Sequence, residues 1–228
     1  MRIIGASACA SINRCWLTQS SRSTAALAST ATPASTRLGN TRRWLDSIVI
    51  GQKLCPFAAP VRAEPQLKLR ASSASTLEDI AAELAEEAVH LQKGIDNPEA
   101  DTTKTTLLVL DTTIGDTALS WRELISLSWK LQAVLVEGEH SKHMQLVLFH
   151  PEATHNTYAE PGAPADAADY SIRAPYPVVQ LLRECDILEA VEKYPDAAGI
   201  PVRNGTRLRA IGVEKCAATL KACFGSSQ

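Results

Sequence analysis

The chain has 228 residues, of which 45% are hydrophobic, so it can bury one sizeable core, and its length favours a single domain with appended segments. Its formal net charge of −2 hides an asymmetry, because six arginines and no acid precede Asp46, which leaves 17 basic against 25 acidic residues in the rest. That acidic body argues against nucleic acid as a partner, and no apolar run approaches the length of a membrane span.

The first 40 residues have the composition of an organellar targeting segment. They contain arginine, are crowded with serine, threonine and alanine, and lack acids, and no continuous apolar stretch of the secretory type is present. We therefore expect residues 1–40 to be disordered, to pack against nothing and to be removed on import. The mitochondrial matrix is the first expectation for the location and a plastid is the alternative. A single globular domain is expected over residues 41–228.

Strands and amphipathic helices alternate through the first part of that domain. A helix capped by Asn40 or Thr41 is expected to end near Leu54, because Pro56 pushes the residue before it out of helical space. Alternating apolar residues predict a strand at 67–71. Ser75 and Glu78 then form a capping box for a helix that stops near Gly94.

Further elements follow in the same pattern. A second strand is expected at 106–110, a helix capped by Asp116 carries an apolar stripe to Leu135, and a third strand covers 146–149. Apolar residues at helical spacing then predict a helix from Pro177 to Cys185, with the proline at its first position.

The last part of the chain is expected to be helical. Asp186 caps a segment ending near Tyr194, and a final region begins near Pro201 and pauses at Gly212. The elements together predict an α/β (or α+β) fold with a small three- to four-stranded sheet, amphipathic helices packed on it and a helical C-terminal region. A fourth strand, if present, is expected at 61–64.

A long connection between the third strand and Pro177 carries most of the candidate functional residues. Connections of this length are usually functional or disordered. His150 follows the strand directly and offers a general acid or base, although it is as well explained as a residue that fixes the loop through a backbone hydrogen bond. Tyr170 and Tyr176 offer proton donors, and Arg173 offers an anion-binding fork. We expect His150, Arg173 and Tyr176 to meet in one pocket.

Two more arginines extend the anion hypothesis. Arg183 and Arg203 are candidates to converge with Arg173 on one carboxylate or phosphate. Arg183 has a simpler explanation, which is an ion pair on a helix surface with an acid such as Asp186.

The cysteines and histidines give weaker indications. Cys55 is a candidate nucleophile, but a part of the core beside Phe57 is the favoured interpretation, as it is for Cys185 on a predicted apolar stripe. Cys216 and Cys223 are also expected in the core. His140 and His143 have zinc-ligand spacing only on a regular helix, so no metal site is predicted. No glycine-rich phosphate loop occurs, so the sequence does not indicate nucleotide binding by such a loop, and the cofactor is left unassigned.

Several ordered motifs resemble those of the DUF1415 family. They are residues 54–58 (LCPFA), 149–151 (FHP), 169–177 (DYSIRAPYP), 181–184 (LLRE) and 203–204 (RN) ahead of Leu208 and Arg209. The resemblance extends over roughly residues 44–212 and adds Asn204 to the candidate binding residues. The family has no established activity, so the resemblance supports a site without assigning its chemistry.

The sequence is compatible with two functions from different classes. The first is an enzyme acting on a small anionic metabolite, with acid–base chemistry from His150, Tyr170 and Tyr176. In that hypothesis the substrate is held by Arg173, Arg183, Arg203 and Asn204. The alternative is a non-catalytic module that binds a metabolite or docks a protein through its proline- and tyrosine-rich loop. The sequence does not establish that the protein is an enzyme, nor its oligomeric state.

Overall fold

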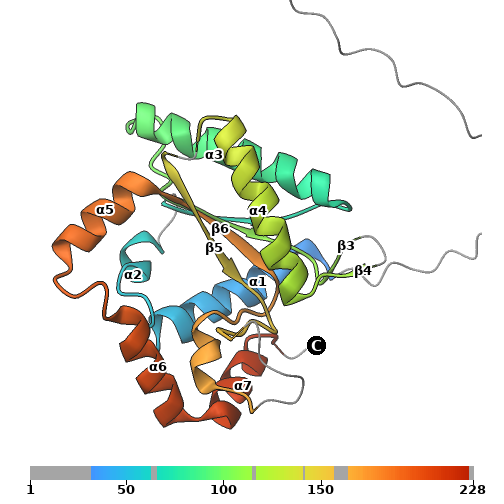
Figure 1. The fold of residues 1–228 in the computed structure, drawn as a ribbon, viewed down its shortest axis with the longest axis vertical. Helices are drawn as coiled ribbons and strands as arrows, with labels where there is room; N and C mark the ends of the chain where they lie inside the picture. The colour runs from blue at the N-terminus through green and yellow to red at the C-terminus, as the bar shows by residue number, and fades with distance from the viewer. Residues whose placement is uncertain (1–31, 63–65, 115–116, 141, 157–163, 226–228) are drawn as a thin grey trace, which may run out of the picture. The chain divides into compact units, whose positions relative to one another are not determined.

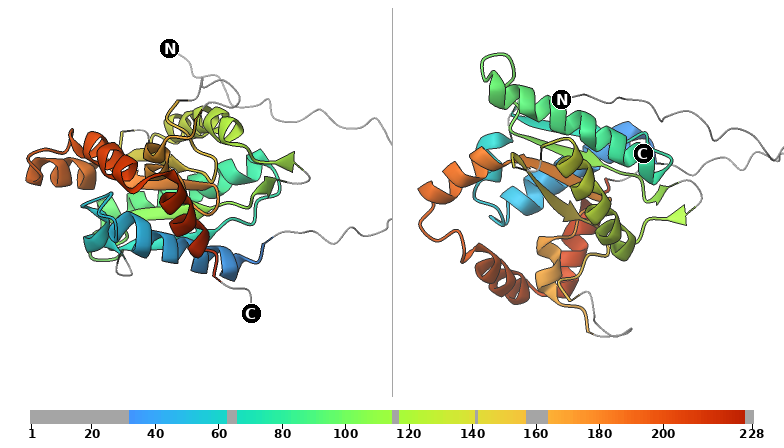
Figure 2. Two further views of the ribbon diagram at one scale, coloured as in Figure 1. Left: turned by 90° about the horizontal axis from the view of Figure 1, so that it is seen from below. Right: turned by 45° about the horizontal axis from the view of Figure 1, so that its top comes forward.

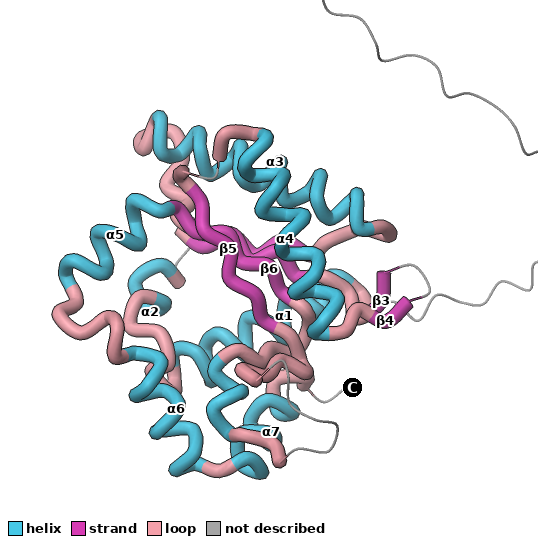
Figure 3. The backbone as a smooth tube through the Cα atoms, viewed as in Figure 1, coloured by secondary structure: helices cyan, strands magenta, loops and turns pink. Residues whose placement is uncertain are grey.

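The structure, a computed structural model, describes residues 32–62, 66–114, 117–140, 142–156 and 164–225. Its centre is a four-stranded mixed sheet in the order β1-β2-β6-β5 (Figures 1 and 3). The strands are β1 (Leu67–Ala71), β2 (Thr105–Val109), β5 (Met144–Phe149) and β6 (Val178–Arg183). β1 and β2 are parallel, whereas β6 is antiparallel to both β2 and β5. The predicted α/β class with a small sheet is therefore confirmed.

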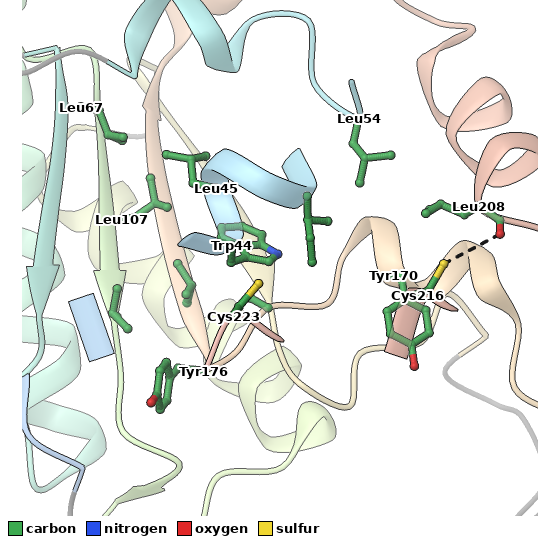
Figure 4. Close-up of a cluster of buried hydrophobic side chains, with 14 of the residues drawn as sticks. Trp44, Leu45, Leu54, Leu67, Leu107, Tyr170, Tyr176, Leu208, Cys216 and Cys223 are labelled. Atoms are coloured by element: carbon green, nitrogen blue, oxygen red, sulfur yellow. Dashed lines mark hydrogen bonds between the residues drawn. The ribbon is translucent and has the colours of Figure 1, made fainter. Parts of the chain in front are cut away.

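Helices cover both faces of this sheet (Figure 2). On one face α3 (Leu77–Asp96) and α4 (Trp121–Glu137) bury a core rich in leucine. On the other, a second core joins the sheet to α1 (Ala34–Trp44) and the π-helix Leu45–Ile50. The same core includes residues of the C-terminal helices, as Figure 4 shows for Leu208, Cys216 and Cys223.

Local sequence sets where α3 and α4 begin. Thr76 accepts a hydrogen bond from the Asp79 amide and its own amide donates to the Asp79 carboxylate, which is a capping box one residue beyond the predicted Ser75–Glu78 pair. Ser120 and Glu123 form the equivalent box on α4, so the predicted start at Asp116, itself outside the described residues, came too early.

The predicted helix from Pro177 to Cys185 is wrong, because Val178–Arg183 is the strand β6 between β2 and β5. A strand buried on both faces is a nearly continuous apolar run, and over six residues such a run fits a helix equally well. Pro177 consequently caps no helix, and its carbonyl instead accepts a hydrogen bond from the Leu110 amide at 2.9 Å. β6 is also the fourth strand of the sheet, which was expected at 61–64. Val61 instead ends the short helix α2 (Ala58–Val61), and residues 63–64 lie outside the described residues.

The folded unit begins earlier than the composition suggested. α1 starts at Ala34, and within it Arg37 and Asn40 are only 6% and 1% exposed. The Arg37 guanidinium donates to the carbonyls of Val109, at 3.1 Å, and Ser72, at 2.9 Å. The prediction that residues before Thr41 pack against nothing is therefore wrong for Arg37 and Asn40. Most of the predicted targeting segment, residues 1–31, lies outside the described residues.

The C-terminal region is helical, as predicted. It consists of α5 (Glu184–Lys193), α6 (Ile200–Ile211) and α7 (Val213–Ala222), and Gly212 separates the last two with a φ of 90°. Cys216 and Cys223 are buried, which confirms their core assignment. Cys185 is exposed on α5, so its predicted place in the core is wrong, because the stripe that suggested it belongs to a strand.

The edge strand β1 is charged, and its charges are neutralised by α3. Glu87 is 1% exposed and accepts hydrogen bonds from Lys68 (2.9 Å), Arg70 (2.9 Å) and Thr106 (3.0 Å). Burial alone would raise the pKa of Glu87, but these hydrogen bonds outweigh it and hold the pKa below its ordinary value. Glu87 is thus a buried carboxylate that ties the β1 edge to the helix above it.

Candidate functional site

His150 is a buried residue whose two ring nitrogens are both engaged with the backbone. Its Nε2 lies 2.7 Å from the Leu119 carbonyl oxygen, and its Nδ1 accepts a hydrogen bond from the Glu152 amide at 3.0 Å. Since a carbonyl can only accept, the proton of the neutral ring must be on Nε2. Burial lowers the pKa of His150, which keeps the ring neutral. This is the arrangement of a histidine that fixes a loop.

Arg173 is held within the same loop. Its Nε donates to the Ala153 carbonyl at 2.9 Å, and its guanidinium carbon lies 4.6 Å from the centre of the Tyr170 ring. One terminal nitrogen is 3.8 Å from a carboxylate oxygen of Asp169, and the side chain is only 18% exposed. The guanidinium therefore contacts an acid, a carbonyl and an aromatic face of its own segment.

Tyr176 belongs to the contact between this loop and α1. Its hydroxyl oxygen accepts a hydrogen bond from Asn40 Nδ2 at 2.7 Å, and its ring centre lies 5.8 Å from that of Phe224. Trp44 Nε1 donates to the Arg173 carbonyl at 2.9 Å, which fastens the loop at a second point. Within the described residues, no hydrogen bond, ion pair or ring contact joins the side chains of His150, Arg173 and Tyr176 to one another.

Arg183 has the partner that the simpler explanation named. It is 8% exposed, and its Nε and Nη2 donate to the two carboxylate oxygens of Asp186 at 2.6 and 3.2 Å. Its Nη1 donates to the Thr103 carbonyl at 3.2 Å. Arg183 lies at the end of β6, directly before α5, and its pair with Asp186 is structural.

The other three candidates come together at a different place. Cys55, Arg203 and Asn204 line a cavity of about 410 Å³ between the chain after the π-helix and α6. The remaining lining residues are Ile50, Lys53, Pro56, Ala59, Tyr194, Ile200 and Arg207. Three of the lining side chains are basic and none is acidic.

The cavity exists because α6 holds the segment that follows the π-helix. The chain turns at Lys53, whose φ of 55° is in the left-handed region, and this turn directs successive carbonyls toward α6. Arg207 Nη1 donates to the carbonyls of Gln52 (2.7 Å) and Lys53 (3.0 Å), and Asn204 Nδ2 donates to that of Leu54 (2.7 Å). These side-chain-to-backbone hydrogen bonds therefore join α6 to residues 52–54, on the other side of the cavity.

The charges at the cavity are only partly neutralised. Arg203 bonds to the carboxylate and the carbonyl of Asp196 and lies over the ring of Tyr194, 5.8 Å from its centre. Arg207 donates to neutral carbonyls, and the Lys53 ammonium has no ion pair within the described part of the chain. The lining of the cavity thus has a net positive charge, and its Lys53 and Arg207 side chains are exposed.

Cys55 lies in this cavity as a half-buried neutral thiol. Burial raises the pKa of Cys55, and hydrogen bonds from the amides of Phe57 and Ala58 offset only part of that effect. Because the thiolate is the nucleophile, a raised pKa makes this sulfur less reactive at neutral pH. The residue contributes to the wall of the cavity.

Sequence reasoning missed Lys53 and Arg207. The signal for Arg207 was available, because it stands four residues after Arg203 and residues at that spacing share a helix face. Lys53 directly precedes the LCPFA motif, but its left-handed backbone conformation has no sequence signature in a lysine.

Neither a metal-ligand cluster nor a membrane-spanning helix is present among the described residues. Among the residues that the structure describes, no group of three or more His, Cys, Asp or Glu side chains is placed to hold a metal ion. None of the described helices combines the length and apolarity needed to cross a membrane.

Fold and site together define a mixed-sheet α/β domain with a cationic cavity beside its C-terminal helices. The model of one family, described as "Protein of unknown function (DUF1415)", matches residues 36–218, and the chain belongs to this family. The resemblance of the motifs is thereby confirmed, and the match begins within α1. No curated protein and no solved structure matches the chain.

The raised pKa of Cys55 leads to a reactivity prediction with an internal reference. With iodoacetamide at pH 7, Cys55 should be alkylated no faster than the exposed Cys185. Its rate should keep rising at alkaline pH, because a raised pKa postpones thiolate formation. Mass spectrometry of digests taken over time measures both thiols in one sample. Alkylation of Cys55 many times faster than that of Cys185 at pH 7 would contradict a purely structural role for Cys55 in the cavity wall. It would instead indicate that Cys55 is a nucleophile.

Proposed function

We propose that this protein binds a small anionic metabolite in the cavity between the Lys53–Cys55 turn and α6. The observation that carries the proposal is a cavity of about 410 Å³ lined by Lys53, Arg203 and Arg207 without any acidic side chain. This local positive charge contrasts with the rest of the chain, because 17 basic and 25 acidic residues follow the six N-terminal arginines. A negatively charged ligand relieves the repulsion among these cations.

The lining indicates the class of ligand. Guanidinium groups match carboxylate and phosphate oxygens in a two-pronged geometry, and Arg203 and Arg207 stand one helical turn apart on α6. Ile50, Pro56 and Ile200 add an apolar wall. A volume of this size is within the usual range for small-molecule sites. The fitting ligand is therefore a small compound that carries carboxylate or phosphate groups.

Catalysis is the alternative hypothesis. An enzyme that uses His150, Tyr170 and Tyr176 for acid–base chemistry, with Arg173 on the anion, stays a prediction. Binding takes precedence because both nitrogens of His150 already bond to backbone groups and the Tyr176 hydroxyl accepts from Asn40. A protein-docking role for the loop is less favoured for a related reason, since Tyr170 and Tyr176 are buried.

Thermal unfolding with citrate and with inorganic pyrophosphate tests the binding proposal. Each ligand that binds only the native state raises its stability by mass action. Arg207→Gln and Lys53→Asn should each remove most of the rise, since a hydrogen bond to a charged group contributes about 1.5–3 kcal/mol. Asparagine is chosen at position 53 because it tolerates the left-handed conformation.

Arg209→Gln is the matched control, because Arg209 is also an exposed arginine of α6 but pairs with Asp166 away from the cavity. It should keep the full ligand-induced rise. Each variant is compared with its own ligand-free melting temperature, so that a loss of stability alone is not counted. The proposal fails if Arg173→Ala abolishes the rise and the two cavity variants retain it.

Mitochondrial import remains a second proposal, supported by the arginine-containing, acid-free composition of the first residues. Because α1 begins at Ala34, the cleavable part must end before that residue. A fluorescent protein fused behind residues 1–33 should accumulate in mitochondria, with plastids as the alternative destination. A fusion that stays in the cytosol would refute the proposal.

A further inference from the structure

The linker between α5 and α6 (residues 194–199) carries an acid that bonds to one of the cationic residues of the cavity (Figure 1). The Asp196 carboxylate accepts a hydrogen bond from Arg203 Nη1, and the Asp196 carbonyl accepts one from Arg203 Nη2 at 3.0 Å. Nη2 also donates to the Tyr194 hydroxyl at 3.4 Å. The two terminal nitrogens, which together form an end-on grip on a carboxylate or phosphate, are therefore both engaged within the protein.

The local backbone prepares Asp196 for this contact. One oxygen of its carboxylate accepts a hydrogen bond from the Gly199 amide at 3.2 Å, and the other accepts from Arg203. Gly199 also makes room for the pair, because a Cβ at this position would lie 2.6 Å from Arg203 Nη1 and 2.5 Å from a carboxylate oxygen of Asp196. Any other residue at position 199 would have to push the two side chains aside, so the pair depends on this glycine.

The pair is accessible to solvent and lies beside the cavity. The side chains of Asp196 and Arg203 are 68% and 40% exposed, and an ion pair between exposed side chains is weak. Arg203 lines the cavity together with Tyr194, over whose ring its guanidinium lies. Exposed side chains change rotamer rapidly. Arg203 can therefore exchange Asp196 for an anion in the cavity by rotation of its own side chain.

Asp196 has an advantage over a ligand in this exchange. It stands seven residues before Arg203 in the chain, so the tether gives its carboxylate a high effective concentration at the guanidinium. Arg207, by contrast, donates to the neutral carbonyls of Gln52 and Lys53. A ligand thus meets a competing carboxylate at Arg203 and only neutral acceptors at Arg207.

We propose that Asp196 is a built-in competitor of the anionic ligand, which holds Arg203 until the ligand displaces it. This inference rests on the proposed function, because it concerns the same cavity. Lys53 and Arg207 hold the anion first, and Arg203 then exchanges Asp196 for it. Asp196 thereby lowers the affinity of the site for its ligand and keeps Arg203 paired before the ligand arrives.

Titration calorimetry of the full chain with citrate and with inorganic pyrophosphate tests this role. Asp196→Asn should tighten the binding of both ligands about two- to fivefold, the range expected for the loss of an exposed ion pair. Asparagine keeps the oxygen that accepts from the Gly199 amide and removes only the charge. Asp166→Asn is the matched control, since Asp166 also pairs with an arginine of α6, Arg209, but away from the cavity. It should leave both affinities unchanged.

A double-mutant cycle distinguishes competition for Arg203 from a general effect of charge. In an Arg203→Gln background, Asp196→Asn should give no gain in affinity, because the group for which it competes is missing. An equal gain in that background overturns the inference, since it shows an effect that does not pass through Arg203.

The same titrations separate this inference from the proposed function. A wild-type chain that binds neither ligand contradicts both. A wild-type chain that binds them, together with an Asp196→Asn variant that binds them equally or more weakly, leaves the proposed function standing and overturns the role of Asp196.

Discussion

The structure depends on three polar side chains of α1 that donate into the body of the domain. Arg37 donates to backbone carbonyls at the ends of β1 and β2, Asn40 to the Tyr176 hydroxyl, and Trp44 to the Arg173 carbonyl. All three donors are on a helix that is nearly fully buried along this face. A buried acceptor that loses its donor costs about 1–3 kcal/mol, so α1 is fixed in position and in rotation.

This constraint explains why the long loop has its unusual composition. Tyr176 lies between prolines because its hydroxyl must meet Asn40, and a restricted backbone lowers the entropy cost of holding it there. Arg173 and His150 fix the remainder of the loop to the Ala153, Leu119 and Glu152 backbone groups. The loop whose residues look catalytic in the sequence thus provides the surface on which α1 packs. The π-helix that continues α1 then delivers the chain to the cavity beside α6.

Elements with a one-sided periodicity could be predicted from the sequence. β1, α3 and α4 were, because each has one buried and one more exposed face, whereas β2 and β5 were recognised as short apolar runs bounded by polar or turn residues. β6 was not, because apolar residues on both its faces leave no period to distinguish strand from helix. The start of α1 was missed for another reason. Its arginine and threonine residues match a targeting segment in composition, and only tertiary contacts reveal that Arg37 and Asn40 are buried.

The site could be predicted only in part. The motif residues Cys55, Arg203 and Asn204 were predicted and share one cavity. Their proximity to Lys53 depends on a left-handed turn that no sequence pattern predicts.

The central claim is that an anion binds at the cavity beside α6 and that residues 150–156 and 164–177 of the long loop serve to hold α1 in place. Hydrogen exchange of the full chain, followed by mass spectrometry with and without citrate or pyrophosphate, tests this most directly because it locates the ligand without any mutation. The account predicts slower amide exchange in residues 50–58 and 200–207, with the loop unchanged. Protection concentrated in residues 150–156 and 170–177 would contradict it.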